Sequence, residues 1–255
     1  MSTRQLFYVA GVDGCKGGWF VVIVSRMKED SRTDTPCVLK VKKSLVARDF
    51  AEVLSKTTDC ELVCVDIPIG LSDGNRPRGC DVAARELLHR PRASSIFPAP
   101  IRPCLMAKDY ETACRISSEH SGKNLTKQSF ALLKKIRQVN DLITPALQNR
   151  FREIHPEISF WALNNKRPMR HNKKRFVGRK ERAKLLSAIF ENVEKIISEA
   201  RRPGKVAPDD ILDALVAAWT ACQAVSGKTE TLPQKPELDS KGLRIEILYP
   251  VCYNQ

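Results

Sequence analysis

Residues 7–24 read "FYVAGVDGCKGGWFVVIV", and they hold the first clue to the architecture of the chain. Two apolar runs flank a glycine-rich turn, so we expect strands at about 6–13 and 19–25 that form a hairpin. The first run ends on Asp13, and a buried carboxylate needs a cation, hydrogen-bond donors or an exposed strand end. Three interpretations of Asp13 are open here: a metal ligand, part of a phosphate-cradling loop, or a plain turn residue.

A second aspartate stands in a similar place. The segment "ELVCVDIPIGL" (61–71) reads as a short strand of a sheet covered on both sides, and Asp66 ends its apolar run. Pro68 prevents that strand from continuing regularly through a central sheet. If the two apolar strands are parallel neighbours, both aspartates lie at the carboxyl edge of the sheet, where open α/β sheets bind their ligands.

The other segments complete an α/β pattern with a helical middle part. Helical spacing or apolar alternation marks most of them, and Pro156 stops a short strand. We expect strands at 38–45, 151–158 and 243–251, helices at 46–56, 80–90, 107–120, 126–149, about 178–200 and 208–227, and a polar loop at 228–241.

The last helix, which begins "PDDILDALVAAW", supplies a third group of acids. Asp209 and Asp210 follow Pro208 and suit the first turn, where acids favour the helix dipole. Asp213 lies a turn deeper among apolar residues, and it shares a face with Asp210. Small residues make the helix slim enough to approach a sheet closely, namely Ala214, Ala217, Ala218 and Ala221.

These acids indicate a site for divalent cations. Two strand-end carboxylates and the pair Asp210 and Asp213 can enclose one or two ions, and oxygen ligands favour Mg²⁺ or Mn²⁺. Such a site suits phosphodiester hydrolysis, with two metals typically about 3.5–4 Å apart. Glu153 is a further candidate ligand, and His155 or Glu157 is a candidate for moving protons or orienting water. A lone histidine before a proline is, however, more often structural.

The charge of the chain favours an anionic partner. The 255 residues carry a net charge of +14, and nucleic acid is the commonest partner of such a protein. Residues 166–184 hold ten Lys or Arg against one Glu, and Lys173, Lys174 and Arg175 are the candidates for gripping phosphate. The alternative is a solvated loop and helix face.

The middle of the chain holds further candidate phosphate ligands. Arginines surround the segment "ASSIFPAP", and arginines with hydroxyls near a metal site can hold a phosphate or carboxylate. The alternative is a proline-stiffened loop with ordinary surface arginines. Together with Lys16 of the glycine turn, the candidates for substrate binding are Arg85, Arg92, Ser94 and Ser95.

Other features exclude several classes of protein. No apolar run approaches a membrane span, and the start "MSTRQLFYV" lacks the regions of a signal peptide, so we expect a cytoplasmic protein, or a nuclear one in a nucleated cell. The nine cysteines lie mostly in apolar runs. Only Cys60 and Cys64 are close together, without partners for a tetrahedral zinc site, so we expect reduced core thiols.

Five blocks of the sequence resemble a known family: "GVDGCKGGW", "VDIPIGL", "CDVAARELLHRPRASSIFPAP", "EIHPEISFWALN" and "DDILDALVAAW". They look like the blocks of domain-of-unknown-function family 429, described as predicted nucleases of the ribonuclease H-like superfamily, and span about residues 8–222. The resemblance implies a mixed five-stranded sheet of order 3-2-1-4-5 flanked by helices. It places Asp13 on the first strand, Asp66 on the fourth and Asp213 on the last helix as the acidic, metal-binding set.

The resemblance also implies the organisation of the chain. We expect one ribonuclease H-like domain over 1–255, with a mainly helical insertion at about 79–150 and a basic helical segment at about 166–200. The "DxxDAL" form of residues 210–215 is similar to the final helix of Holliday-junction resolvases of that superfamily.

The leading hypothesis is therefore a metal-dependent nuclease or phosphodiesterase acting on RNA or DNA. A second hypothesis is an actin-like phosphotransferase, because "DGCKGG" is similar to the phosphate loop of those proteins; ATP binding by the purified protein would favour it. A third is a nucleic-acid-binding protein without catalysis, which predicts salt-sensitive binding without metal-dependent turnover.

Overall fold

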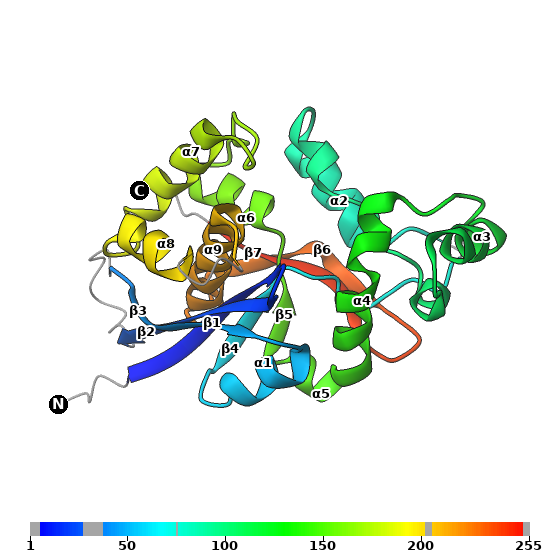
Figure 1. Ribbon diagram of the computed structural model, residues 1–255, viewed down its shortest axis with the longest axis horizontal. Helices are drawn as coiled ribbons and strands as arrows, with labels where there is room; N and C mark the ends of the chain where they lie inside the picture. The colour runs from blue at the N-terminus through cyan, green and yellow to red at the C-terminus, as the bar shows by residue number, and fades with distance from the viewer. Residues whose placement is uncertain (1–5, 28–37, 75, 202–205, 252–255) are drawn as a thin grey trace.

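The glycine-rich turn joins two long antiparallel strands, β1 (Leu6–Cys15) and β2 (Gly18–Met27). The computed structural model describes residues 6–27, 38–74, 76–201 and 206–251 (Figure 1). In it the hairpin forms the centre of a five-stranded mixed sheet of order β3-β2-β1-β4-β5, as expected. Strands β1, β4 and β5 are parallel, whereas β2 runs antiparallel to both its neighbours. The other three strands are β3 (Lys40–Ala47), β4 (Leu62–Val65) and β5 (Phe151–Glu153).

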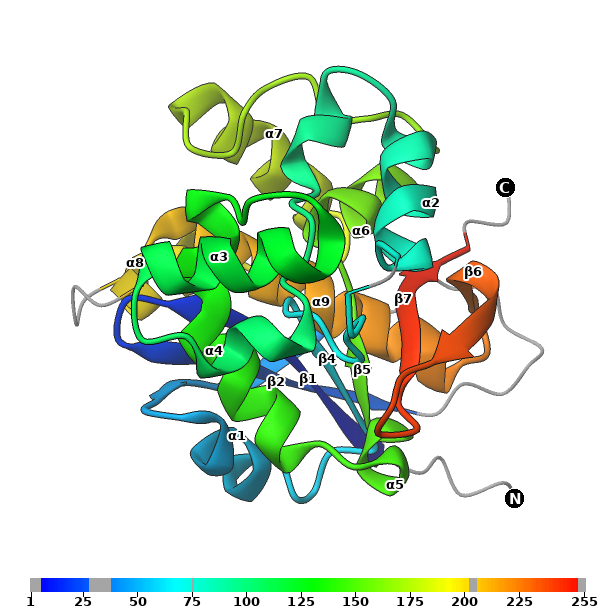
Figure 2. The ribbon, with the colours of Figure 1, turned by 90° about the vertical axis from the view of Figure 1, so that its right-hand side faces the viewer.

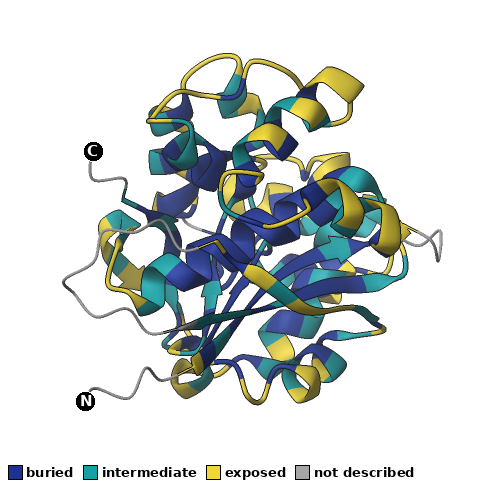
Figure 3. Ribbon diagram, turned by 90° about the vertical axis from the view of Figure 1, so that its left-hand side faces the viewer, coloured by how far each residue is buried: buried dark blue, intermediate teal, exposed yellow. Residues whose placement is uncertain are grey.

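Helices cover both faces of this sheet. The last helix, α9 (Pro208–Val225), packs on one face, and its apolar residues join those of β1, β2 and β4 in one core cluster. On the other face α1 (Phe50–Lys56) and α4 (Lys127–Leu142) bury Phe50 and Ile136 against the strands, and α3 (Tyr110–Ser121) lies outside α4 (Figure 2). Buried residues accordingly run along the strands at the centre of the molecule (Figure 3).

A glycine permits the close contact between β1 and α9. A Cβ atom at Gly11 would lie 2.0 Å from the carbonyl oxygen of Ala214 and 2.2 Å from the backbone nitrogen of Ala218. Both neighbours are backbone atoms of a helix, so they cannot move aside as the end of a side chain can. The small residues of α9 thus meet the sheet at a strand position that lacks a side chain, which confirms the slim helix expected from the alanines.

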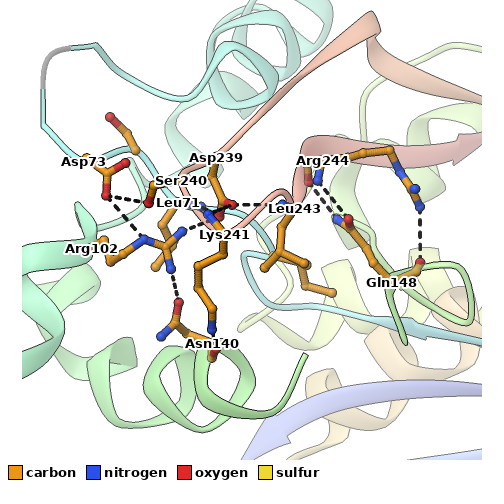
Figure 4. Close-up of polar contacts among 12 residues, drawn as sticks. Leu71, Asp73, Arg102, Asn140, Gln148, Asp239, Ser240, Lys241, Leu243 and Arg244 are labelled. Carbon is orange, nitrogen blue, oxygen red and sulfur yellow. Dashed lines mark hydrogen bonds and ion pairs between the residues drawn. The ribbon is translucent and has the colours of Figure 1, made fainter. Parts of the chain in front are cut away.

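The chain ends in a second, two-stranded sheet of β6 (Thr229–Leu238) and β7 (Arg244–Pro250). The expected polar loop at 228–241 is therefore wrong: pairing with β7 makes this polar segment a strand. Asp239 fixes the turn between the two strands (Figure 4). Its carboxylate accepts the backbone N–H groups of Lys241 (2.8 Å), Leu243 (2.9 Å) and Leu71 (3.0 Å), and it pairs with Arg102.

Several other boundaries differ from the expectation for local reasons. The helix expected at 46–56 begins only at Phe50, because Asp49 caps it and accepts the Glu52 N–H (2.9 Å). The strand expected at 151–158 ends at Glu153, because Pro156 opens a helix. The remaining helices are α2 (Gly79–Leu88), η1 (Arg92–Ser95), η2 (Arg102–Met106), α5 (Pro145–Gln148), α6 (Pro156–Leu163), α7 (Phe176–Leu186) and α8 (Val193–Arg201).

Two further sequence expectations concern membrane spans and thiols. Among the described helices, none has both the length and the apolar character needed to cross a membrane. The described cysteines are free thiols, most of them buried, as expected. Cys37 and Cys252 lie outside the described residues.

Candidate active site

Asp13 and Asp66 lie side by side where two parallel strands separate. The pairing of β1 with β4 ends at Val12 and Val65, so each aspartate is the first residue beyond it. The Asp66 N–H donates to the Val12 carbonyl (2.9 Å), which fixes the chain at this level. β1 continues as a hairpin with β2, whereas β4 stops. The two acids therefore stand at the carboxyl edge of the sheet, as their positions in the sequence indicated.

Helix α9 brings a third carboxylate to this edge. Oxygens of Asp13, Asp66 and Asp213 all lie within 4.8 Å of one another, and the Asp213 residue is only 1% exposed. Oxygen ligands of Mg²⁺ lie about 2.0–2.1 Å from the ion in octahedral geometry, which sets them roughly 3–4 Å apart. The three carboxylates thus match a single divalent ion after small side-chain movements.

Partners of individual oxygen atoms support this fit. Asp13 Oδ1 accepts the Gly14 N–H (2.7 Å), and Asp213 Oδ2 pairs with Lys173. The other oxygen of Asp213, Oδ1, is buried and has no hydrogen-bond partner among the described residues. A buried carboxylate oxygen without a donor is costly, and a cation at this position would satisfy it.

The pKa shifts of Asp13 and Asp66 also support a cation site. Burial, followed by the charges of Asp66 and Asp213, raises the pKa of Asp13 well above its usual value. Burial also raises the pKa of Asp66 to about 7, with Asp213 adding to the rise and Lys173 opposing it. Like charges this close favour binding a proton or a cation. The site therefore favours the binding of a cation.

Two neighbouring acids on α9 have separate partners. Asp209 forms an ion pair with Lys174 (2.8 Å), and Asp210 accepts the Ala207 N–H (3.2 Å) at the start of the helix. Asp210 thus acts as a helix cap, the alternative considered for first-turn acids. It also lies close enough for its charge to raise the pKa values of Asp13 and Asp66.

A cavity of about 450 Å³ opens in front of the acids. It lies between the segment before α7 and the segment after α2, which flank the upper part of the molecule in Figure 1. Lys16, Arg85 and Arg175 are exposed and stand outside its lining, and the buried Asp213 also lies outside it, behind Asp13 and Asp66. The predicted site residues that line it are Asp13, Asp66, Asp210, Glu153, His155, Glu157, Arg92, Ser94, Ser95, Lys173 and Lys174.

Glu153 belongs to a different group from the three aspartates. Its carboxylate accepts the Ile69 N–H (2.6 Å) and pairs with the buried Arg78. Arg78 also lies 3.3 Å from Asp81, whose carboxylate accepts the Ala99 N–H (3.1 Å). The guanidinium already supplies a positive charge to these acids. Glu153 therefore holds the segments around the cavity together.

His155 and Glu157 are also engaged in structural contacts. Nδ1 of His155 accepts the Glu157 N–H (3.2 Å). Burial, with the nearby charge of Lys173, lowers the pKa of His155 to about 3, so its ring stays neutral. Glu157 pairs with the buried Arg182. His155 thus caps the start of α6.

Among the polar residues of the lining, Asp81, Lys135 and Asn172 were not singled out from the sequence. Lys135 of α4 donates to the Gly18 carbonyl, and its stem lies against Gly14, beside the first aspartate. The amphipathic pattern of α4 marks Lys135 only as a residue off the apolar face. Nothing local in the sequence distinguishes these residues from surface polar residues.

Comparison with known proteins gives a family without a stated activity. The family model described as "Protein of unknown function (DUF429)" matches residues 11–238, most of the chain. No curated protein and no solved structure matches the chain.

Proposed function

The chain belongs to the DUF429 family, and we propose that it is a metal-dependent phosphodiesterase with a ribonuclease H-like fold that cleaves nucleic acid. One observation carries the proposal: Asp13, Asp66 and Asp213 converge within 4.8 Å, with a buried Asp213 oxygen that has no donor among the described residues. Hydrolysis of a phosphodiester is the reaction that such a carboxylate site supports best, because a divalent cation held there both lowers the pKa of an attacking water and neutralises phosphate charge.

The arrangement of strands supports the ribonuclease H-like assignment. The sheet order β3-β2-β1-β4-β5 agrees with the order that the sequence resemblance implies. The acids also come from the elements that it implies: one on β1, one directly after β4 and one on α9. Because a fold alone does not fix a function, the proposal depends on the site and uses the fold only as support.

The chain's own residues divide the work of the reaction. Asp13, Asp66 and Asp213 would hold Mg²⁺ or Mn²⁺, which when bound supplies a water of lowered pKa and neutralises phosphate charge. In the reaction the water oxygen bonds to phosphorus and the bond from phosphorus to the ester oxygen breaks. The proton released by the water ends on the leaving oxygen, so the products are a phosphate monoester and a hydroxyl group.

Part of the cavity lining suits a phosphate group. Arg92, Ser94 and Ser95 line it; Arg92 also donates to the Arg170 carbonyl (3.3 Å), and the Ser94 hydroxyl donates to the Pro91 carbonyl (2.7 Å). Guanidinium and hydroxyl donors at this place would hold the non-reacting phosphate oxygens once the Ser94 hydroxyl turns toward them. We assign these three residues to substrate positioning.

The actin-like alternative receives less support from the geometry. A phosphate loop needs its backbone and lysine at the ligand, whereas Lys16 sits at the exposed tip of a two-residue hairpin turn. It stands outside the lining of the cavity.

A cleavage screen tests the proposal. Purified protein with Mg²⁺ or Mn²⁺ is offered single-stranded RNA, single-stranded DNA, an RNA–DNA hybrid and a small phosphodiester. We expect cleavage of at least one substrate that EDTA stops, that Asp66→Asn loses and that Asp59→Asn, an exposed acid elsewhere, retains. Equal turnover by wild type and Asp66→Asn would reject the site.

A further inference from the structure

One cation of the chain already lies within the acid site. The Lys173 ammonium group is hydrogen-bonded to Asp213 Oδ2, and its side chain is 34% exposed. The ion pair places the positive charge of Lys173 at the edge of the aspartate group.

The loop that carries Lys173 is held in place by hydrogen bonds and close packing against α7. Glu181 of α7 accepts the backbone N–H groups of Arg170 (2.9 Å) and His171 (3.0 Å). Arg182, which is fully buried, donates to the His171 carbonyl (3.1 Å). Gly178 allows the loop to pack on the helix, because a Cβ there would lie 2.1 Å from the Asn172 carbonyl oxygen. The folded backbone, not only a long side chain, directs Lys173 to the acids.

We propose that Lys173 takes the place of the second cation, so that the site binds one divalent ion instead of two. This inference rests on the proposed function and specifies how its metal centre is built. The three charges of Asp13, Asp66 and Asp213 are balanced by one divalent ion together with one ammonium group. Two ions beside Lys173 would leave an excess of positive charge on these acids, and the repulsion between the cations would weaken the binding of the second ion.

The chemistry of an ammonium group suits this place. A second metal in a phosphodiesterase stabilises the charge on an oxygen of the reacting phosphate, and a lysine donates hydrogen bonds to the same oxygen. Lys173 lines the cavity, so its ammonium group is accessible to a bound phosphate. A matched control is Lys127, an exposed lysine of α4 that stands outside the cavity lining.

The test is titration of the full chain with Mn²⁺, followed by electron paramagnetic resonance. Wild type is expected to bind one ion per chain. Lys173→Gln should bind Mn²⁺ about tenfold or more tightly, since a repelling charge next to the ion is gone. Lys173→Arg and Lys127→Gln should keep the wild-type affinity. Circular dichroism verifies that each variant is folded, and the wild-type stoichiometry gives a result without any variant.

The possible outcomes distinguish a failure of the role proposed for Lys173 from a failure of the proposed function. Two ions per wild-type chain, or one ion with equal affinity in Lys173→Gln, would overturn the role of Lys173 and leave the metal centre standing. Absence of Mn²⁺ binding to wild type and to every variant would overturn the proposed function, and this inference with it.

Discussion

Three aspartates near the start of α9 have three different environments. Asp209 pairs with an exposed lysine, Asp210 caps the helix, and Asp213 is buried against Asp13 and Asp66. Within five residues, aspartate thus serves as the buried partner of an exposed lysine, as a cap and as a candidate metal ligand. Asp209 and Asp213 are both buried, at 4% and 1% exposure, so their partners and not their burial separate these roles.

The asparagine variants of these three positions should differ in turnover and in stability. Asp213→Asn keeps the shape but loses the charge, so turnover should fall by about 100-fold or more, because misplacement of reacting groups is that costly. Asp210→Asn should give an intermediate loss of activity and lower stability by about 0.3–1 kcal/mol. Asp209→Asn should leave activity unchanged, since Asp209 pairs with Lys174 and lies outside the group of Asp13, Asp66 and Asp213. Turnover and thermal melting of the three variants measure this series.

The order of the three effects is the informative result. Full activity in Asp213→Asn would remove α9 from the site and leave Asp13 and Asp66 without a third ligand. A larger loss of stability in Asp213→Asn than in Asp210→Asn, with turnover intact, would assign Asp213 to the packing of the helix.

At the scale of elements, the contact between β1 and α9 positions the acids. β1 carries Asp13 two residues after Gly11, and α9 carries Asp213 one residue before Ala214, which Gly11 touches. The contact that joins the two elements is therefore also the contact that sets the distance between their carboxylates.

A side chain at Gly11 should disturb both packing and metal binding. Gly11→Ala puts a methyl group into helix backbone, and overpacking of this kind costs about 3 kcal/mol or more at a site without room to relax. Mn²⁺ affinity should fall as well, since α9 must shift. Gly79→Ala is the control, because a Cβ there meets nothing within 4 Å. Equal melting temperatures and Mn²⁺ affinities in the two variants would contradict the close contact.

Sequence patterns predicted those elements that bury a regular face. The β1–β2 hairpin, β4 and α9 have continuous or periodic apolar residues, and each forms where expected. Strand β6 was missed because "TETLPQKPEL" has neither alternation nor an apolar run, and only its pairing with β7 makes it a strand. The segment after β5 was misassigned because Pro156 ends one element and also opens the next.

At the scale of the whole molecule, the sequence predicts the three aspartates of the site but not the residues that surround them. Asp13, Asp66 and Asp213 interrupt apolar runs, which gives each a local signal. Lys135 and Asp81 come from helices of the middle part of the chain, and only the packing of that part against the sheet brings them to the cavity. Lys173 was expected to face a phosphate backbone, whereas the structure turns it toward Asp213.

The remaining positive charge of the basic segment predicts how the protein binds nucleic acid. Arg175, Lys180 and Lys184 are exposed, and the last two lie one turn apart on α7. Each lost phosphate contact lowers the slope of log affinity against log salt by about one. Replacing all three with Gln should therefore weaken binding and flatten the slope by about three, measured by fluorescence anisotropy on a labelled single strand.

A control with the same change of charge tests whether the effect is local. Lys123, Lys127 and Lys134 are exposed on the other part of the molecule and are replaced with Gln in the same way. Slopes that fall equally in both triple variants would show that net charge, not the basic segment, governs binding.

The most direct test of the account is metal titration of the double variant Asp13→Asn/Asp66→Asn. Asparagine keeps the shape of both side chains and removes the buried like charges, so the variant should fold at least as well as wild type. Isothermal titration calorimetry should detect Mg²⁺ or Mn²⁺ binding to wild type and to the surface control Asp59→Asn, and none to the double variant. Undiminished metal affinity in the folded double variant would contradict the account.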